Sequence, residues 1–265
     1  MQSKEMLMKS KKIKRVNALL VKKFGIPKRN GLPNPLDLLI ATILSQNTND
    51  NNSYKAFQNL KSCYKSWDEL LDEKRSAIKS RIRIAGLAEQ KSAAIKNLIT
   101  ELHKKNDLGL LSIKQLENEQ AIEQLTAHKG IGVKTASCVL LFALDRNVCP
   151  VDTHVHRTTN RIGIVKEKTP DKTFFALNQN FTEGIAHSFH TNLIKLGREI
   201  CKPTNPSCGI CPLLKICNFP NKNLTGKTTG KKREFMLLDN VDVKGETSDV
   251  KGERSNVKGE TKNDR

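Results

Sequence analysis

The sequence predicts an all-α fold. Apolar residues recur at the three-to-four-residue spacing of helices, and no stretch of the folded part alternates with a period of two for long enough to make a strand. Glycine and proline fall mainly where the periodic segments end. At 265 residues the chain has room for one or two helical domains and a sizeable core.

The chain is strongly basic, with 46 Lys and Arg against 27 Asp and Glu, a net charge of +19. From Gly226 onward ten basic residues face eight acidic ones, so residues 1–225 carry +17 of this charge. Such a surface indicates a polyanionic partner, most often nucleic acid. The first residues are too charged for a secretory signal, and no apolar run approaches the roughly 18 residues of a membrane span. We therefore expect a cytoplasmic protein with no membrane partner.

The first expected helix covers 13–24, where apolar residues recur at helical spacing until Gly25 and Pro27 end the run. The next begins at Pro35, which suits a first helical position. Nearly every face of 36–44 is apolar, so this helix is expected to be central and buried.

Several shorter helical signals follow. Residues 66–69 have the spacing of a capping box, and the segment 75–85 reads as a helix that stops at Gly86. Helical patterns continue through 92–104 and 118–125.

The second half of the chain contributes two more helices and a tail. Thr169 is a cap ahead of Pro170, and a last helix runs from about 184 to 199. Residues 243–263 repeat a seven-residue unit that holds one valine. One valine per repeat cannot build a core, so we expect 223–265 to be disordered.

A glycine hairpin separates the helical segment 118–125 from a buried helix over 133–144. Gly130 and Gly132 flank Ile131, and glycines can take positive φ and leave their amides uncovered. With the N-terminus of the following helix they would form a pocket of N–H donors suited to one phosphate. Glycines in this spacing also simply end helices, so the pattern alone is weak.

Two ionisable residues accompany the hairpin. Lys134 lies two positions after the second glycine, and Asp152 follows it by eighteen residues. Considered alone, Lys134 is expected to be a solvated helix residue, and Asp152 is expected to be the N-cap of a helix that begins at Thr153. His154 lies next in the same helix, where capping, packing or a phosphate contact is expected of it.

Four cysteines crowd into one proline-rich loop with the spacing C-x6-C-x2-C-x5-C; they are Cys201, Cys208, Cys211 and Cys217. Four thiolates this close in sequence can converge on one metal centre. Zinc accepts such a set, and so does a [4Fe-4S] cluster. The remaining Cys63, Cys138 and Cys149 are expected to be packed thiols.

The hairpin with Lys134 and Asp152, followed by the four cysteines, resembles the endonuclease III family of DNA glycosylases over roughly residues 8–220. The resemblance implies that Lys134 is a nucleophile and that Asp152 is its partner. It also implies that the four cysteines hold a [4Fe-4S] cluster. The activity it implies is that of a bifunctional glycosylase and abasic-site lyase of base excision repair, which removes oxidised or damaged pyrimidines and then cleaves the strand by β-elimination.

The same resemblance assigns residues that contact DNA. One of the loop neighbours Gln46 and Asn47 would fill the gap left by a flipped base, and Leu87 would wedge between bases of the opposite strand. Helix capping and a helix-end contact explain these residues equally well. The family usually has a proline directly before the first glycine, where this chain has His128-Lys129, so a less rigid hairpin is expected here. The full expected set is Gln46, Asn47, Leu87, Lys129, Gly130, Ile131, Gly132, Val133, Thr135 and His154.

The resemblance also divides the chain. It implies a helical-barrel domain over 30–147 with the helix-hairpin-helix at about 118–144, a cluster domain built from 1–29 and 148–222, and a DNA-binding cleft between the two. The expected protein is a monomer in the cytoplasm of a prokaryote, on double-stranded DNA that carries damaged bases or abasic sites. A related glycosylase for mismatched thymine or uracil, a non-catalytic helix-hairpin-helix DNA-binding protein and a zinc-stabilised helical scaffold are the alternatives.

Overall fold

The computed structural model describes residues 2–29 and 31–225, and regular structure in these residues is helical throughout. The predicted all-α fold is confirmed. The tail prediction over 223–265 falls outside the described residues except for its first three positions. None of the described helices is both long and apolar enough to cross a bilayer.

The elements follow one another along the chain without strands between them. In the described residues the α-helices are α1 (Gln2–Phe24), α2 (Pro35–Ser45), α3 (Asp50–Cys63), α4 (Arg75–Arg81), α5 (Ala88–Lys104), α6 (Leu111–Gln115), α7 (Asn118–Thr126), α8 (Val133–Phe142), α9 (Thr153–Ile162), α10 (Pro170–Asn178) and α11 (Ala186–Glu199). The 3-10 helices are η1 (Trp67–Leu71), η2 (Arg83–Ala85), η3 (Cys208–Ile210) and η4 (Leu214–Ile216).

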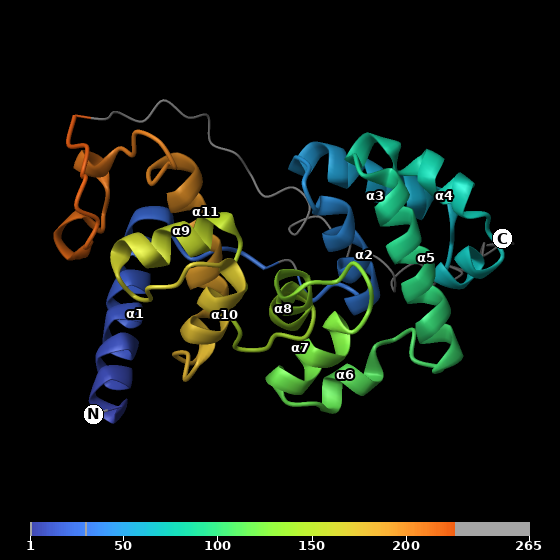
Figure 1. Ribbon diagram of the computed structural model, residues 1–265, viewed down its shortest axis with the longest axis horizontal. Helices are drawn as coiled ribbons and strands as arrows, with labels where there is room; N and C mark the ends of the chain where they lie inside the picture. The colour runs from blue at the N-terminus through green and yellow to red at the C-terminus, as the bar shows by residue number, and fades with distance from the viewer. Residues whose placement is uncertain (1, 30, 226–265) are drawn as a thin grey trace, which may run out of the picture.

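The helices pack in two groups that lie side by side (Figure 1). In one group α11 packs against α1 and α9, and α9 contacts α10. In the other, α2 packs against α3, α5 and α8, while α5 also contacts α4 and η1. Helix α8 joins the groups, because it contacts α10 and α11 as well as α2 and α7. We propose that the two groups correspond to the two domains expected from the sequence.

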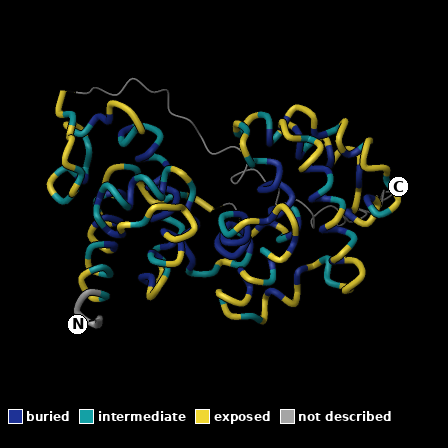
Figure 2. The backbone as a smooth tube through the Cα atoms, viewed as in Figure 1, coloured by how far each residue is buried: buried dark blue, intermediate teal, exposed yellow. Residues whose placement is uncertain are grey.

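Helix α2 is the buried centre of its group, as its apolar sequence predicts. The side chain of Asn34 caps it by accepting hydrogen bonds from the N–H groups of Leu36 (2.9 Å) and Asp37 (3.2 Å). Residues 38–44 are all buried, and Figure 2 shows the same burial along α8. The helix that ends in the expected DNA-contact loop is therefore held on all sides.

Helix α1 begins at Gln2, eleven residues before the expected start at residue 13. Polar contacts hold this early part of the helix. The Nζ atom of Lys9 donates to the carbonyl oxygens of Ala176 (2.8 Å) and Gln179 (3.0 Å). The Ser10 hydroxyl is hydrogen-bonded to Thr182 at 3.1 Å. These are contacts between distant parts of the chain, so the apolar periodicity could not reveal them.

Candidate functional site

The predicted hairpin lies between α7 and α8 and is closed by a hydrogen bond from the Ile131 N–H to the His128 carbonyl (3.1 Å). Gly130 takes a φ of +93°, which favours glycine. Gly132 does not use that freedom, because it is the extended N-cap of α8 with a φ of −98°. A Cβ atom on Gly130 would lie 2.8 Å from the Cβ of Ala94, so the hairpin approaches α5 closely.

The outer face of the hairpin is open and rich in N–H donors. Gly132 has no neighbouring atom within 4 Å of an added Cβ. The first hydrogen bond of α8 runs from the Ala136 N–H to the Gly132 carbonyl (3.0 Å). The N–H groups of residues 133–135 therefore have no acceptor inside the helix, and Lys129 is exposed beside them. Such a helix end can bind a phosphate.

Two of the expected DNA-contact residues have buried side chains. Ile131 is 5 % exposed and Thr135 is 3 % exposed. Their side chains therefore support the hairpin from inside. Val133 is half-buried, as the first residue of α8.

His128 fastens the hairpin to the rest of its group. Its side chain is buried, and its imidazole is hydrogen-bonded to the carboxylate of Glu101 near the end of α5. This pair restrains the hairpin next to the position where the resemblance led us to expect proline and where we expected lower rigidity without it.

Lys134 and Asp152 lie at the N-termini of two different helices. Lys134 is the second residue of α8, and its side chain is half-buried. Asp152 is the N-cap of α9, where its Oδ1 accepts a hydrogen bond from the Val155 N–H at 2.7 Å. The cap interpretation is thus confirmed. Within the described residues the Oδ2 atom of Asp152 accepts no hydrogen bond, so this oxygen is available to another partner.

Lys134 and Asp152 both influence the pKa values of two buried side chains, Cys138 and His190. Burial raises the pKa of the Cys138 thiol, the Lys134 ammonium lowers it, and the Asp152 carboxylate raises it. Burial lowers the pKa of His190 to about 4, while Asp152 raises it and Lys134 lowers it. A side-chain hydrogen bond joins Lys134 to Cys138, and His190 is bonded to the carbonyl of Pro150, two residues before Asp152, so all four side chains share one region of the structure.

His190 was not anticipated from the sequence. Its Nδ1 lies 2.9 Å from the carbonyl oxygen of Pro150, and a carbonyl only accepts, so this nitrogen carries the proton. The ring is neutral near pH 7, which leaves Nε2 as an acceptor. A histidine inside an amphipathic helix gives no signal of what it faces, and no motif marked this one.

His154 packs between helices. A Cβ atom on Gly197 of α11 would lie 2.8 Å from the Cβ of His154, and Arg157 donates to its Nδ1 at 3.1 Å. Burial lowers the pKa of His154. Packing, one of the roles expected from the sequence, accounts for these contacts.

The loop after α2 is hydrogen-bonded to the hairpin. The Nε2 atom of Gln46 donates to the Gly130 carbonyl (3.0 Å) and to the Thr135 hydroxyl (3.3 Å). Its neighbour Asn47 is exposed and has a φ of +49°. Leu87, the N-cap of α5, also has a φ of +49° and is 45 % exposed. Asn47 and Leu87 are thus exposed at turns with positive φ, while hydrogen bonds hold the Gln46 side chain against the hairpin.

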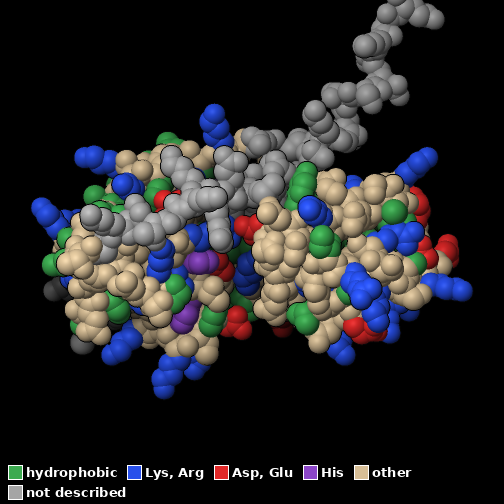
Figure 3. Space-filling model, turned by 90° about the horizontal axis from the view of Figure 1, so that it is seen from above, with side chains coloured by type: hydrophobic (Ala, Val, Ile, Leu, Met, Phe, Trp, Pro, Cys, Tyr) green, Lys and Arg blue, Asp and Glu red, His purple; other side chains and the backbone are tan. Residues whose placement is uncertain are grey.

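The surface is hollowed between the two helix groups, and blue and red side chains of both signs border the hollow (Figure 3). Lys and Arg side chains also project around the rest of this face.

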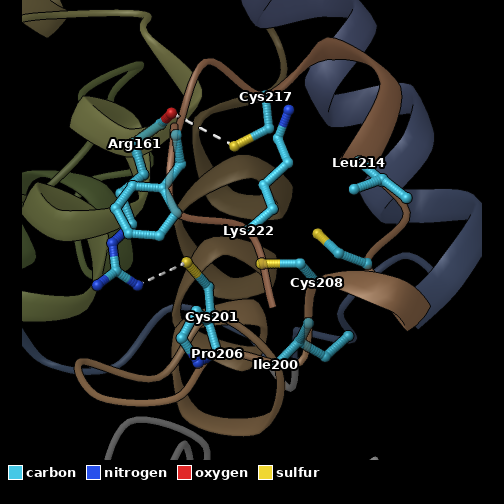
Figure 4. Close-up of a pocket in the computed structure, with 10 residues that line it drawn as sticks. Arg161, Ile200, Cys201, Pro206, Cys208, Leu214, Cys217 and Lys222 are labelled. Carbon is cyan, nitrogen blue, oxygen red and sulfur yellow. Dashed lines mark hydrogen bonds between the residues drawn. The ribbon is translucent and has the colours of Figure 1, made fainter. Parts of the chain in front are cut away.

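The four predicted ligand cysteines line one pocket in the loop after α11 (Figure 4). Ile200, Pro206 and Leu214 give it apolar walls. The Arg161 Nη1 donates to the Cys201 Sγ at 3.5 Å. Burial raises the pKa of the Cys211 thiol to about 11. Within the described residues no three His, Cys, Asp or Glu side chains stand at metal-ligand separations, so the thiols share a pocket but do not meet around one point.

The other three cysteines are separate from this pocket. Cys138 and Cys149 are buried, as expected of packed thiols. Cys63, at the end of α3, is exposed, so the expectation of a packed thiol is wrong there.

Comparison with known proteins gives the family of this chain. Residues 40–183 match the model of the HhH-GPD superfamily of base excision DNA repair proteins. Endonuclease III of Thermotoga maritima is 32 % identical over 212 residues, which cover 80 % of this chain and 95 % of that protein. Solved structures of a non-covalent endonuclease III–DNA complex and of a trapped endonuclease III–DNA covalent intermediate both match with a TM-score of 0.66 and 26 % identity. The match covers 78 % of this chain in each case, and 94 % and 95 % of those chains. The chain therefore belongs to the endonuclease III family within the HhH-GPD superfamily of base excision DNA repair proteins.

Proposed function

We propose that this protein is a bifunctional DNA glycosylase and abasic-site lyase that removes oxidised or damaged pyrimidines from double-stranded DNA. One observation carries the proposal: an amine and a carboxylate stand at the N-termini of α8 and α9 and act on the same two buried side chains, Cys138 and His190. The amine lies in the first turn after an open hairpin that can grip a phosphate.

Each of the two groups has a distinct task in this reaction. Breaking the glycosidic bond builds positive charge on the sugar, and the free oxygen of Asp152 stabilises that charge. The amine of Lys134 attacks C1′ and forms a Schiff base, which permits β-elimination of the 3′ phosphate. The amine must be neutral to attack, so Asp152, directly or through water, accepts its proton as the sugar becomes electrophilic.

The hairpin and the two loops deliver the damaged nucleotide to these groups. The open N–H groups of α8 and the exposed Lys129 hold the backbone. Unstacking a base costs a few kcal/mol, less when the base is damaged. Asn47, which is exposed while Gln46 is bonded to the hairpin, and Leu87 offset that cost by filling the space.

The chemistry of the cysteine pocket suits a [4Fe-4S] cluster, although its thiols do not converge on one point in this structure. Its donor set is four thiols from one loop between apolar walls, and a guanidinium donates to one of the sulfurs. A positively charged metal centre would stabilise thiolates that burial otherwise disfavours. Cys201, Cys208, Cys211 and Cys217 would hold it, and its contribution in this family is structural and redox-sensitive. Iron and sulfide analysis with absorbance near 400 nm separates it from zinc.

Borohydride trapping on duplex DNA with a single abasic site tests the proposal. The wild-type protein is expected to form a covalent adduct and to nick the strand. Lys134→Gln is expected to lower trapping and nicking by at least about 10³-fold, because the attacking amine is gone. Asp152→Asn keeps a good N-cap and is expected to retain stability while losing base excision.

Lys129→Gln is the matched control, since it removes an exposed lysine five positions earlier that takes no chemical part. It is expected to weaken binding while leaving trapping at saturating protein unchanged. A Lys134→Gln protein that still nicks by β-elimination contradicts the proposal. Duplexes with single oxidised pyrimidines, or with mismatched thymine or uracil, then identify the substrate, and sedimentation tests the monomer we propose.

A further inference from the structure

Lys91, in the first turn of α5, is a buried lysine at 2 % exposure with no carboxylate partner within the described residues. Its Nζ atom donates to two backbone carbonyls, Leu44 (2.8 Å) and Ala85 (2.9 Å). Burial lowers the pKa of its ammonium to about 8. Burying the Lys91 ammonium costs desolvation free energy, and packing alone does not explain why a lysine occupies this position.

The two carbonyls come from different elements, and each directly precedes a loop of the candidate DNA surface. Leu44 lies near the end of α2, three residues before Asn47. Ala85 ends η2, two residues before Leu87. The N–H of Lys91 also donates to the carbonyl of Leu87 at 3.0 Å. One residue therefore holds the bases of both loops.

A positive charge suits this place. Carbonyl groups at the end of a helix have no acceptor role inside the helix and carry partial negative charge. A lysine offers three donors from one point, so it can bind carbonyls that approach from two elements. The contact spans α2, η2 and α5, and within the described residues no other side-chain hydrogen bond or ion pair joins these three elements.

We propose that Lys91 is a positioning residue for base excision, which fixes the separation between Asn47 and Leu87 by holding the Leu44 and Ala85 carbonyls on one ammonium. The inference rests on the proposed function, because it takes these two side chains as the ones that enter the duplex. The spacing between them would otherwise depend on two turns with positive φ at their tips.

The test compares abasic sites in duplex and in single-stranded DNA. A single strand has no opposite strand to wedge and no stacked gap to fill, so only the duplex reaction needs the two loops at a fixed separation. Lys91→Met keeps the length of the side chain and removes the donors. In borohydride trapping under single-turnover conditions, we expect it to slow the duplex reaction about 10–100-fold and the single-strand reaction by less than about twofold.

Lys96→Met is the matched control, because Lys96 lies on the same helix and likewise donates to backbone carbonyls, here of Leu71 (2.7 Å) and Glu73 (2.9 Å). Those carbonyls belong to η1 and the turn after it, away from both loops. We expect Lys96→Met to leave the ratio of duplex to single-strand rates unchanged. Thermal unfolding of both variants verifies that they are folded at the assay temperature.

A duplex with 2-aminopurine opposite the abasic site gives a second readout. Saturating wild-type protein is expected to raise its fluorescence by unstacking it, and Lys91→Met to lose most of that rise. Should Lys91→Met not fold, Lys91→Gln, whose amide NH2 keeps two N–H donors without the charge, is expected to show an intermediate ratio. Equal slowing of both reactions by the Lys91 variants, or no slowing, overturns the role of Lys91. Wild-type protein that traps neither substrate overturns the proposed function instead.

Discussion

His128 lies beneath the glycine hairpin with its imidazole against the Glu101 carboxylate. The resemblance led us to expect proline directly before the first glycine, where Lys129 follows His128, and a proline would limit the hairpin through its ring. Here a side-chain pair supplies the restraint, and it connects the hairpin to α5 instead of stiffening the hairpin alone. The site can therefore keep its geometry with a different residue before the first glycine.

This pair predicts a measurable coupling. His128→Ala and Glu101→Gln should each lower the free energy of unfolding, and the double variant should lose less than the sum of the two. We expect a coupling of about 1 kcal/mol, because the histidine is buried while half of the Glu101 side chain is exposed. Urea unfolding of the four proteins measures it. Strictly additive losses would mean that the pair does not hold the hairpin.

Residue-scale prediction from the sequence succeeded where a motif marked the residue and failed where a contact defined it. Lys134 and Asp152 could be named because their spacing from the glycines is fixed along the chain. Lys91 and His190 could not, because each bonds a carbonyl that lies 40 or more residues away along the chain. For Asp152, the capping role followed from local chemistry alone.

At the scale of elements, α5 is the support on which the candidate DNA surface is built. Lys91 holds the two loops, Ala94 lies against Gly130, and Glu101 bonds His128. These positions are three and seven residues apart, so they share one face of the helix. Every predicted DNA-contact loop of this helix group is thus held in place by contacts with α5.

The two hairpin glycines are predicted to respond differently to the same substitution. Gly130→Ala should destabilise the fold by about 1–2 kcal/mol or more, because its φ is +93° and the new Cβ would meet Ala94 at 2.8 Å. Gly132→Ala should cost less, about 0.5–1 kcal/mol, since its φ is ordinary and its surroundings are open, and only the poorer N-cap of alanine counts against it.

Relative to the stability that each variant loses, Gly132→Ala should weaken DNA binding more than Gly130→Ala does. Gly132→Ala places a methyl group where a phosphate would approach, so we expect binding to abasic duplex to weaken about tenfold in a folded protein. Thermal unfolding and fluorescence anisotropy on the same samples separate the two outcomes. Unchanged affinity of Gly132→Ala would remove the hairpin from the phosphate-binding role.

Element-scale prediction depended on apolar periodicity. Helices α2 and α8 could be predicted because continuous apolar runs in the sequence indicate buried helices. The first eleven residues of α1 were missed because polar bonds, such as that from Lys9 to Ala176, hold them in place. Helix α6 was also missed, since five residues are too few to show a period.

At the scale of the whole molecule, buried histidines are predicted to set the acid limit of stability. Burial lowers the pKa of His187 and of His190 to about 4, against an ordinary value of 6.5. Below pH 6.5 the unfolded chain binds more protons than the native protein, so stability is complete above that pH and falls as pH drops toward 4. The slope is about 1 kcal/mol per pH unit for the buried His190.

Urea unfolding at pH 7.5, 6.5, 5.5 and 4.5 measures this loss. His190→Asn removes the titrating ring and keeps a donor for the Pro150 carbonyl, so its stability should vary less steeply over this range. Carboxylates titrate equally in both proteins, and the difference in slope therefore belongs to the histidine. Parallel curves for the two proteins would contradict the assignment.

The distribution of sulfur has a practical consequence for the whole protein. Of the seven cysteines, two are buried, four line the pocket after α11 and Cys63 is exposed. If the pocket is filled as we propose, a mild alkylating reagent should react with Cys63 alone. The unloaded protein should present five reactive sulfhydryls. Counting modified cysteines by mass spectrometry would therefore report occupancy of the pocket in a colourless dilute sample, and Cys63 offers a site for a dye label.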